Sequence, residues 1–521
     1  MPADSVQKRS SFAWVLALLS LAVLGGSALF LRAQRAGLQK PLRIVVAGPA
    51  WTFDPQRHGD ELTRAILGHF YEPLVDFDPD LALRPRLAVA WTSPSETEWR
   101  FQLREKVLFH DGRPFGAEDV KRTLDRARRL AEGFITESDI HAISEVRVED
   151  DHTVVVETSR PRPLLLARLT GILVLPRDTP DSEVWKPVGT GPWVFTGGTT
   201  GPAGAPVEGR RFEYYWGRKP DAHEFRIETV ADEAARTRAA LSGADVTCSL
   251  PRAAFDAAGN PLGAFRVVRR PTLTVAFLAF RIPPNPRLGR TPFQDARVRR
   301  AVSLSLDREL LVREALGGHG KPLWQLAPPG TVGHDPALDR GEPDLPGARR
   351  LLAEAGFPTG FESTLLVDAD RAHVAREIAR QLAAVGIRLD VDAQPWDEVF
   401  RRMLFGLAPA ALSSTNVATG HVSSLYESFL HSSGPDSIFG AENSARFSDP
   451  EVDEKLELAA TSVPPGVREG LLVAVRDRAL RDLPYVPLYS PDALYGVRTG
   501  IAFTPRLDRA VFATDLRRTS R

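Results

Sequence analysis

The chain has 521 residues, of which 43% are apolar and 25% charged, a composition typical of a globular protein rather than a disordered one. Lys plus Arg and Asp plus Glu each number 66, so the formal net charge is zero and no positive field would gather nucleic acid. Cys248 is the single cysteine, which excludes an intrachain disulfide, a cysteine-based zinc site and an iron–sulfur cluster.

The first legible element is an uncharged segment at residues 10–31, preceded by Lys8 and Arg9. A basic start followed by an apolar run is typical of an export signal, and about 20 apolar residues would also span a bilayer as a helix. We therefore expect residues 1–40 to be an export signal or an N-terminal membrane anchor, with residues 12–31 as the tether. The protein is expected in the periplasm or another extracytoplasmic location, and the choice between cleaved signal and retained anchor stays open.

Beyond residue 40 the pattern predicts a mixed α/β body. Leu42–Gly48 is a short apolar run typical of a buried strand, and Asp60 is a good N-cap for a helix that follows it. Val374 to Val385 have helical spacing, and alternation from Ile387 onward predicts a strand directly after that helix.

Signatures of catalysis are missing from the sequence. There is no GxSxG nucleophile elbow and no HExxH helix, and none of the 11 histidines has another four residues away. The glycine-rich stretches at residues 189–193 and 317–322 lack the glycine and Ser/Thr positions that nucleotide loops require. The sequence therefore predicts no enzyme, no cofactor and no metal site.

A series of segments resembles the extracellular solute-binding proteins of family 5, the peptide/nickel class that serves ABC importers. The strongest is WRFQLREKVLFHDGRPFGAEDVKRTLDRA (Trp99–Ala127), with a strand, a Phe-His-Asp-Gly turn and a helix start. About ten such segments, this one included, occur along the chain in the family's order. The others are Thr52–Arg57, His69–Trp91, Val188–Phe195, Tyr214–Pro220, Leu241–Val246, Pro292–Val312, Ala348–Phe361, Phe447–Leu456 and Leu483–Tyr489.

The resemblance implies an α/β, two-lobed periplasmic-binding-protein fold of the Venus-flytrap type, with a small domain inserted in lobe 1. Lobe 1 is expected at residues 41–60, 161–270 and 484–521, the insertion at 61–160, and lobe 2 at 271–483. It implies a protein that captures a small, peptide-like or other solute between its lobes and delivers it to the permease subunits of an ABC importer, acting as a monomer. Two alternatives are a membrane-anchored sensor or scaffold without a transport role and, far behind, an exported hydrolase.

By similarity, the solute contacts come from the loop after the first strand and from one loop of lobe 2. The first loop contributes Pro49, Ala50 and Trp51. The second is Ser413–His421, where Thr415 and Ala418 stand at the positions of a tryptophan and an aspartate that peptide binders of the family carry.

The absence of that aspartate affects the expected solute, because a buried ammonium without a carboxylate loses its charge partner. The loop offers hydroxyl and amide groups instead, which favours neutral or hydrogen-bonding solutes. Asn416, Thr419 and Trp396 complete the set of candidate contacts. For Trp51 and Trp396, packing in a core is an equally good interpretation.

Overall fold

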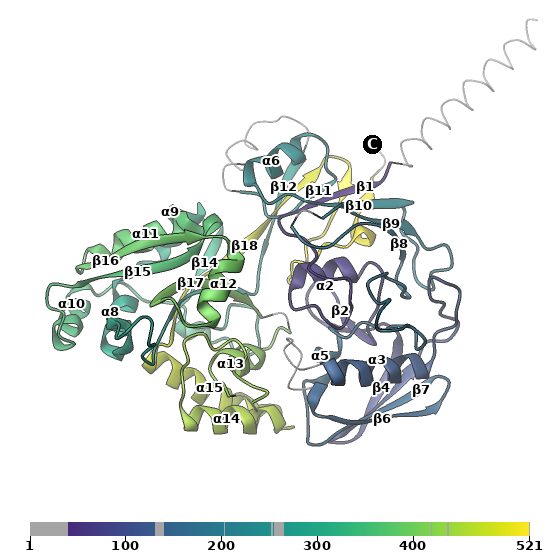
Figure 1. The fold of residues 1–521 in the computed structure, drawn as a ribbon, viewed down its shortest axis with the longest axis horizontal. Coiled ribbons are helices and arrows are strands. Elements are labelled where there is room, and N and C mark those ends of the chain that lie inside the picture. Colours follow the sequence, from purple (N-terminus) through teal and green to yellow (C-terminus); the bar gives the residue numbers. More distant parts are fainter. Residues whose placement is uncertain are drawn as a thin grey trace, which may run out of the picture.

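The computed structural model describes residues 40–130, 140–202, 204–251, 254, 265–417, 419–434 and 437–519. In this part of the chain, two lobes lie side by side and are connected by strands at the centre of the molecule (Figure 1). We call lobe 1 the half that contains β1 (Leu42–Val46) and lobe 2 the half that contains β13 (Thr274–Phe280). The residue boundaries predicted for the lobes stay a prediction, since both lobes share one sheet.

This shared sheet has 12 strands, in the order β16-β15-β17-β13-β18-β11-β1-β10-β9-β8, with β12 and β14 paired to β18 beside this path. In lobe 1, β1 is parallel to β10 and β11, and in lobe 2 β15 is parallel to β16 and β17. The remaining strands of the sheet are β8 (Trp193–Gly197), β9 (Val207–Arg211), β10 (Glu224–Thr229), β11 (Val246–Thr247), β12 (Phe265–Pro271), β14 (Gly320–Pro322), β15 (Phe361–Asp368), β16 (Ile387–Gln394), β17 (Ala410–Asn416) and β18 (Tyr485–Arg498).

A separate antiparallel sheet of four strands, in the order β4-β5-β7-β6, forms the lower end of lobe 1 in Figure 1. Its strands are β4 (Ala88–Ser95), β5 (Glu98–Leu103), β6 (Ile143–Asp150) and β7 (Thr153–Thr158). The helix α3 (Ala117–Leu130) covers it, because Val120 and Leu124 share a hydrophobic core with Val154 and Val156. Two short ribbons pair β2 (Val75–Phe77) with β3 (Leu83–Pro85) and β19 (Ile501–Ala502) with β20 (Arg517–Arg518).

Several helices begin directly after an aspartate whose carboxylate accepts from a backbone N–H of the first turn, for example Asp60 before α2 and Asp449 before α14. The α-helices not yet named are α2 (Glu61–Leu67), α5 (Leu165–Leu169), α6 (Glu233–Leu241), α8 (Ala296–Ser305), α9 (Arg308–Leu316), α10 (Leu345–Glu354), α11 (Ala372–Ala383), α12 (Trp396–Leu404), α13 (Ser423–Phe429), α14 (Pro450–Thr461) and α15 (Pro465–Asp482). Four short 3-10 helices are η1 (Pro292–Gln294), η2 (Pro336–Leu338), η3 (Ala369–Arg371) and η4 (Ala513–Asp515).

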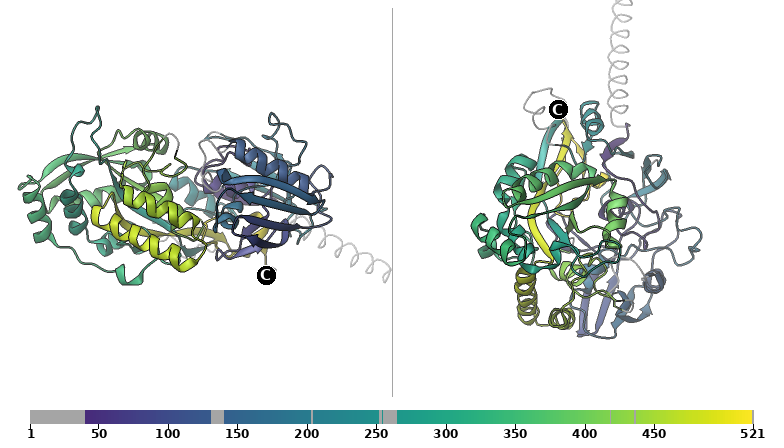
Figure 2. Two further views of the ribbon diagram at one scale, coloured as in Figure 1. Left: turned by 90° about the horizontal axis from the view of Figure 1, so that it is seen from below. Right: turned by 60° about the vertical axis from the view of Figure 1, so that its left-hand side comes forward.

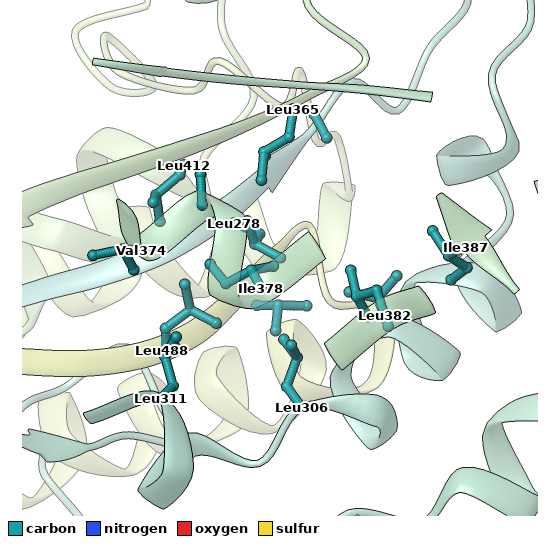
Figure 3. Packing of buried hydrophobic residues seen from close by; sticks show 14 of the residues in the cluster. Leu278, Leu306, Leu311, Leu365, Val374, Ile378, Leu382, Ile387, Leu412 and Leu488 are labelled. Carbon is teal, nitrogen blue, oxygen red and sulfur yellow. The ribbon is translucent and has the colours of Figure 1, made fainter. Parts of the chain in front are cut away.

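Lobe 2 has a core on each face of its part of the sheet, and β13 supplies both. Leu278 packs with Ile378 and Leu382 of α11 on one face (Figure 3), whereas Phe277 packs against Phe429 of α13 on the other. The left view of Figure 2 shows α14 and α15 of lobe 2 beside the four-stranded sheet of lobe 1, at the same end of the molecule.

The lobes are joined through β18, whose 14 residues belong to both. Its first half pairs with β13 in lobe 2 and its second half with β12 and β11 in lobe 1. Where the strands cross, the hydroxyl of Thr272 donates to the carbonyl of Pro491 at 2.7 Å, and the hydroxyl of Ser490 donates to the carbonyl of Thr272 at 3.0 Å. These crossing segments are the place where the lobes can turn relative to each other.

The helix–strand unit predicted after Val374 is confirmed as α11 and β16, with Gly386 at a φ of 87° between them. The predicted tether, residues 12–31, lies outside the described residues. Among the residues that are described, no helix is long and apolar enough to cross a membrane.

Candidate functional site

The carboxyl ends of the parallel strands in both lobes lead into the space between the lobes. In an open α/β sheet, ligands bind outside these strand ends, in particular where neighbouring connections leave in opposite directions. In lobe 1, β1 ends at Val46 between β10 and β11, and in lobe 2 β17 ends at Asn416. A hydrogen bond from Asn416 Nδ2 to Glu61 Oε1, at the start of α2, connects the two ends directly.

Two other contacts cross between the lobes. Arg168 of α5 forms an ion pair with Glu427 of α13, with 3.0 Å between Nη2 and Oε2, and these side chains are only 11% and 9% exposed. Arg509 follows β18 in lobe 1, and its Nη1 donates to Thr274 Oγ1 of β13 at 3.3 Å. One apolar contact joins these polar ones, since Leu81 of lobe 1 packs against the core of lobe 2 that contains Phe277.

Charges gather around Glu61 at the centre of this interface. Burial raises the pKa of the Glu61 carboxyl group, while the charge of Arg509 and the hydrogen bond from Asn416 oppose that shift. Burial likewise raises the pKa of Tyr495, and it raises the pKa of the Cys248 thiol to about 12. The charge of Arg509 opposes both shifts. A thiol with this pKa is not a nucleophile at neutral pH.

Unpartnered polar atoms mark the same region. The Tyr495 hydroxyl belongs to a side chain that is 2% exposed, and it has no hydrogen-bond partner among the described residues. Asn416 Oδ1 is also buried without a partner there. Since buried polar groups are normally hydrogen-bonded, such atoms indicate a place where a ligand or water binds.

The loop after β1 lies beside Glu61 at the start of α2, but its three predicted contact residues differ in how far they are exposed. The backbone N–H of Trp51 donates to Thr63 Oγ1 of α2 at 3.1 Å, and the Trp51 side chain is 51% exposed. Pro49 is half-buried. Ala50 is 3% exposed and packs in the core of lobe 1, so its side chain faces away from the cleft.

The lobe 2 candidates are also placed differently. Asn416 contacts Glu61, whereas Thr415 lies next to it on β17 and Thr419 donates to the carbonyl of His421. Ala418 lies outside the described residues. Thus, in the loop that the resemblance pointed to, Asn416 makes a hydrogen bond to the other lobe.

Trp396 opens α12, which Figure 1 shows on the side of lobe 2 that faces α2 of lobe 1. The residue is 57% exposed, and its ring stacks on Phe400, with 5.1 Å between the ring centroids. Packing in a core, the other interpretation of Trp51 and Trp396, is wrong for both residues, because about half of each side chain is exposed.

Sequence reasoning missed Glu61, Tyr495 and Arg509. These residues lie in segments with no recognisable motif, and Glu61 is more than 400 positions from the other two, so the fold alone brings them together. Asp60 gave a partial signal, because it places the following residue at the start of a helix that leads into the cleft.

The other groups considered for chemistry have structural roles. His110 of the Phe-His-Asp-Gly turn is bound between backbone groups, with Nε2 3.0 Å from the Gly191 carbonyl and Nδ1 accepting from the Gly189 N–H. Burial lowers the pKa of His110 to about 4, so the ring is neutral at pH 7. The described residues contain no group of three or more His, Cys, Asp or Glu side chains that could hold a metal ion.

Comparison with known proteins shows to which family the chain belongs. Residues 82–437 match the model of the bacterial extracellular solute-binding proteins, family 5 Middle. The chain belongs to this family. It is therefore a solute-binding protein of the importer-associated, non-enzymatic type, located outside the cytoplasm, as the resemblance implied.

Curated relatives span most of the chain. Protein XP55 of Streptomyces lividans is 28% identical over 82% of this chain and 79% of its own length. The glutathione-binding protein GsiB of Escherichia coli strain K12 is 26% identical over 89% of this chain and 91% of its own length.

Solved structures confirm the predicted lobed fold with its additional small antiparallel sheet. The binding protein AgaA from A. tumefaciens R10, in complex with agropinic acid, has a TM-score of 0.78 and 25% identity over 92% of this chain and 99% of its own. A dipeptide-binding protein from Pseudoalteromonas, in complex with Met-Leu, has a TM-score of 0.80 and 20% identity over 92% of this chain and 100% of its own.

Proposed function

We propose that the chain binds a small peptide-like or related polar solute between its lobes and delivers it to the permease subunits of an ABC importer. The observation that carries this proposal is the meeting of the two sets of strand ends at Glu61 and Asn416, with the unpartnered Tyr495 hydroxyl beside them. The named ligands of the relatives, glutathione, agropinic acid and a dipeptide, are small molecules of this kind.

The exposed rings of Trp51 and Trp396 support the same proposal, because aromatic side chains on opposite walls of a cleft can pack on a solute when the lobes close. Pro49, Thr415, Asn416, Ala418 and Thr419 complete the proposed contact set. Residues 12–31 would hold the protein at the membrane if they are retained, close to the permease that receives the solute.

Ligand-induced stabilisation tests this function directly. The chain beginning at Lys40 is unfolded thermally with peptides, opines, sugars and chelated metals, and native mass spectrometry detects any solute carried through purification. A solute at 100 times its Kd adds about 2.7 kcal/mol to the free energy of unfolding. In a chain of this size, this raises Tm by a few degrees, because the shift per kcal/mol falls as the chain grows. If no solute in the panel changes Tm or the mass spectrum, the binding function is wrong.

A further inference from the structure

Two opposite charges in the cleft are close to each other and yet unpaired. Among the described residues, neither Glu61 nor Arg509 makes an ion pair, although each is bonded to one of two neighbouring residues. Arg509 donates to Thr274, which lies directly opposite Asn416 on the adjacent strand, and Asn416 donates to Glu61. An exposed arginine is ordinarily just solvated, but Arg509 has a φ of 62°, a left-handed conformation that non-glycine residues seldom adopt. The pair of Arg506 and Asp508, buried and 2.7 Å apart, holds the backbone in this turn.

The Glu61 end of this cluster offers mainly acceptors. Asn416 Nδ2 already donates to Glu61, which leaves the second carboxylate oxygen and the buried Asn416 Oδ1 without donors from the described residues. An ammonium group has three N–H donors and no acceptor, so it suits this pair. Its charge would also relieve the cost of burying the carboxylate.

The Arg509 end of the cluster offers donors. Its guanidinium has five N–H groups, of which the contact with Thr274 Oγ1 uses one. The Tyr495 hydroxyl, buried and without a partner among the described residues, is a further donor, and the charge of Arg509 opposes the rise in its pKa that burial causes. A carboxylate accepts from both kinds of donor, and charge-assisted bonds of this type are the strong ones.

We propose that Glu61 with Asn416 binds an ammonium group, and Arg509 with Tyr495 binds a carboxylate group, of one zwitterionic solute. The closeness of Glu61 and Arg509 favours an α-amino-acid head group, in which both charged groups are attached to the same carbon atom. This inference rests on the proposed solute-binding function and names the class of solute. The carboxylate that the Ser413–His421 loop lacks is then supplied by the opposite lobe.

The alternative is that Glu61 and Asn416 only hold the lobes together. In that case, removing the charge of Glu61 would weaken the binding of every solute equally, whatever charges the solute carries. A head-group site, in contrast, loses affinity only for solutes that carry the matching charge. Probes that differ in one charged group therefore separate the two interpretations.

The experiment measures Kd by isothermal titration calorimetry with γ-glutamylglycine, its N-acetyl form and its α-amide, and with free L-glutamate and glutathione as further carriers of the head group. We expect N-acetylation or α-amidation to weaken binding by about 10- to 100-fold, the usual effect of losing a charge-assisted hydrogen bond. L-Alanylglycine, whose charged termini lie on different residues, is expected to bind more weakly.

Two variants locate the effect. Glu61→Gln keeps the shape and the contact with Asn416, and it should weaken binding of the free head group about as much as N-acetylation does, with no further loss for the N-acetyl probe. Arg509→Gln should do the same for the α-amide. Glu362→Gln and Arg388→Gln, both at exposed positions of β15 and β16 in lobe 2, are the matched controls.

Equal binding of blocked and free probes, or unchanged affinity in both variants, would overturn the head-group site while leaving solute binding intact. The same holds if no head-group compound binds but another member of the solute panel does, or if L-alanylglycine binds more tightly than γ-glutamylglycine. Failure of the whole panel would instead remove the proposed function itself.

Discussion

The two lobes are joined in two chemically different ways. At the crossing segments, neutral hydroxyls of Thr272 and Ser490 bond to backbone carbonyls beside continuous strands. Across the cleft, the contacts include an ion pair between Arg168 and Glu427 and a bond from Asn416 to the Glu61 carboxylate. The first kind depends little on how far the lobes open, whereas the second kind exists only when they are closed.

This difference separates stability from closure. Charged groups that part on opening are solvated in the open form, so they bias the equilibrium between the two forms rather than the stability of each lobe. The crossing strands, by contrast, are part of the cores of both lobes. A change at the crossing segments should therefore alter the free energy of unfolding, and a change across the cleft should alter the affinity for solute.

The largest effect is expected within β18 itself. Leu488 is fully buried in the core of lobe 2, on the strand that both lobes share. Leu488→Ala should lower the free energy of unfolding by about 2–5 kcal/mol, because the cavity is only partly refilled. Urea denaturation measures the change, and Val473→Ala, at an exposed position on α15, is the control. A change below about 1 kcal/mol would show that the crossing strand adds little to stability.

How far the sequence predicts this molecule depends on the range of the interactions. Local signals were sufficient for β1, for α2 behind Asp60, and for α11 followed by β16. They were not sufficient for β18, which continues to Arg498. Pro491 and Asp492 resemble a strand end in sequence, and only pairing with β12 and β14 keeps them in the sheet.

The site was less predictable than the fold. The resemblance led to Asn416 because that residue lies within a recognisable loop. Glu61 and Arg509 could not be predicted as a pair, since their closeness arises from the packing of α2 against the chain after β18. The expected preference for neutral solutes considered one loop only, and a carboxylate from the opposite lobe changes that expectation.

A smaller effect, seen in affinity rather than in stability, is expected at the ion pair between the lobes. Arg168→Gln removes the ion pair with Glu427 in the closed form, which should weaken solute binding by about 10- to 100-fold through a lower population of closed protein. Calorimetry gives the affinity, and small-angle X-ray scattering gives the change in radius of gyration on adding solute.

Two controls sharpen this prediction. Arg147→Gln removes an exposed ion pair with Glu157 and should change nothing measurable. Ser490→Ala removes a hydroxyl at the crossing segments and should lower the free energy of unfolding by about 1 kcal/mol without changing affinity. Equal loss of affinity in Arg168→Gln and Ser490→Ala would contradict the distinction between the junctions.

The smallest effect concerns how stability depends on pH through the titration of Glu61. The groups around this carboxyl group include Asn416, Arg509, Asp508 and Arg64. Burial raises its pKa above the ordinary value of 4.5, so the closed protein keeps this proton at pH values where the unfolded chain has lost it. The empty protein should therefore lose stability relative to Glu61→Gln as pH rises from about 4.5 through the raised pKa, and the difference should stay constant above it.

A bound ammonium group should reverse this preference, because it favours the carboxylate and lowers its pKa. Binding of γ-glutamylglycine is then expected to release protons between the lowered and the raised pKa, and Glu61→Gln should abolish that release. Calorimetry in buffers of different ionisation enthalpy measures it. Proton uptake on binding, or a release that persists in Glu61→Gln, would mean that Glu61 does not face a cation, and that the contact with Asn416 serves closure alone.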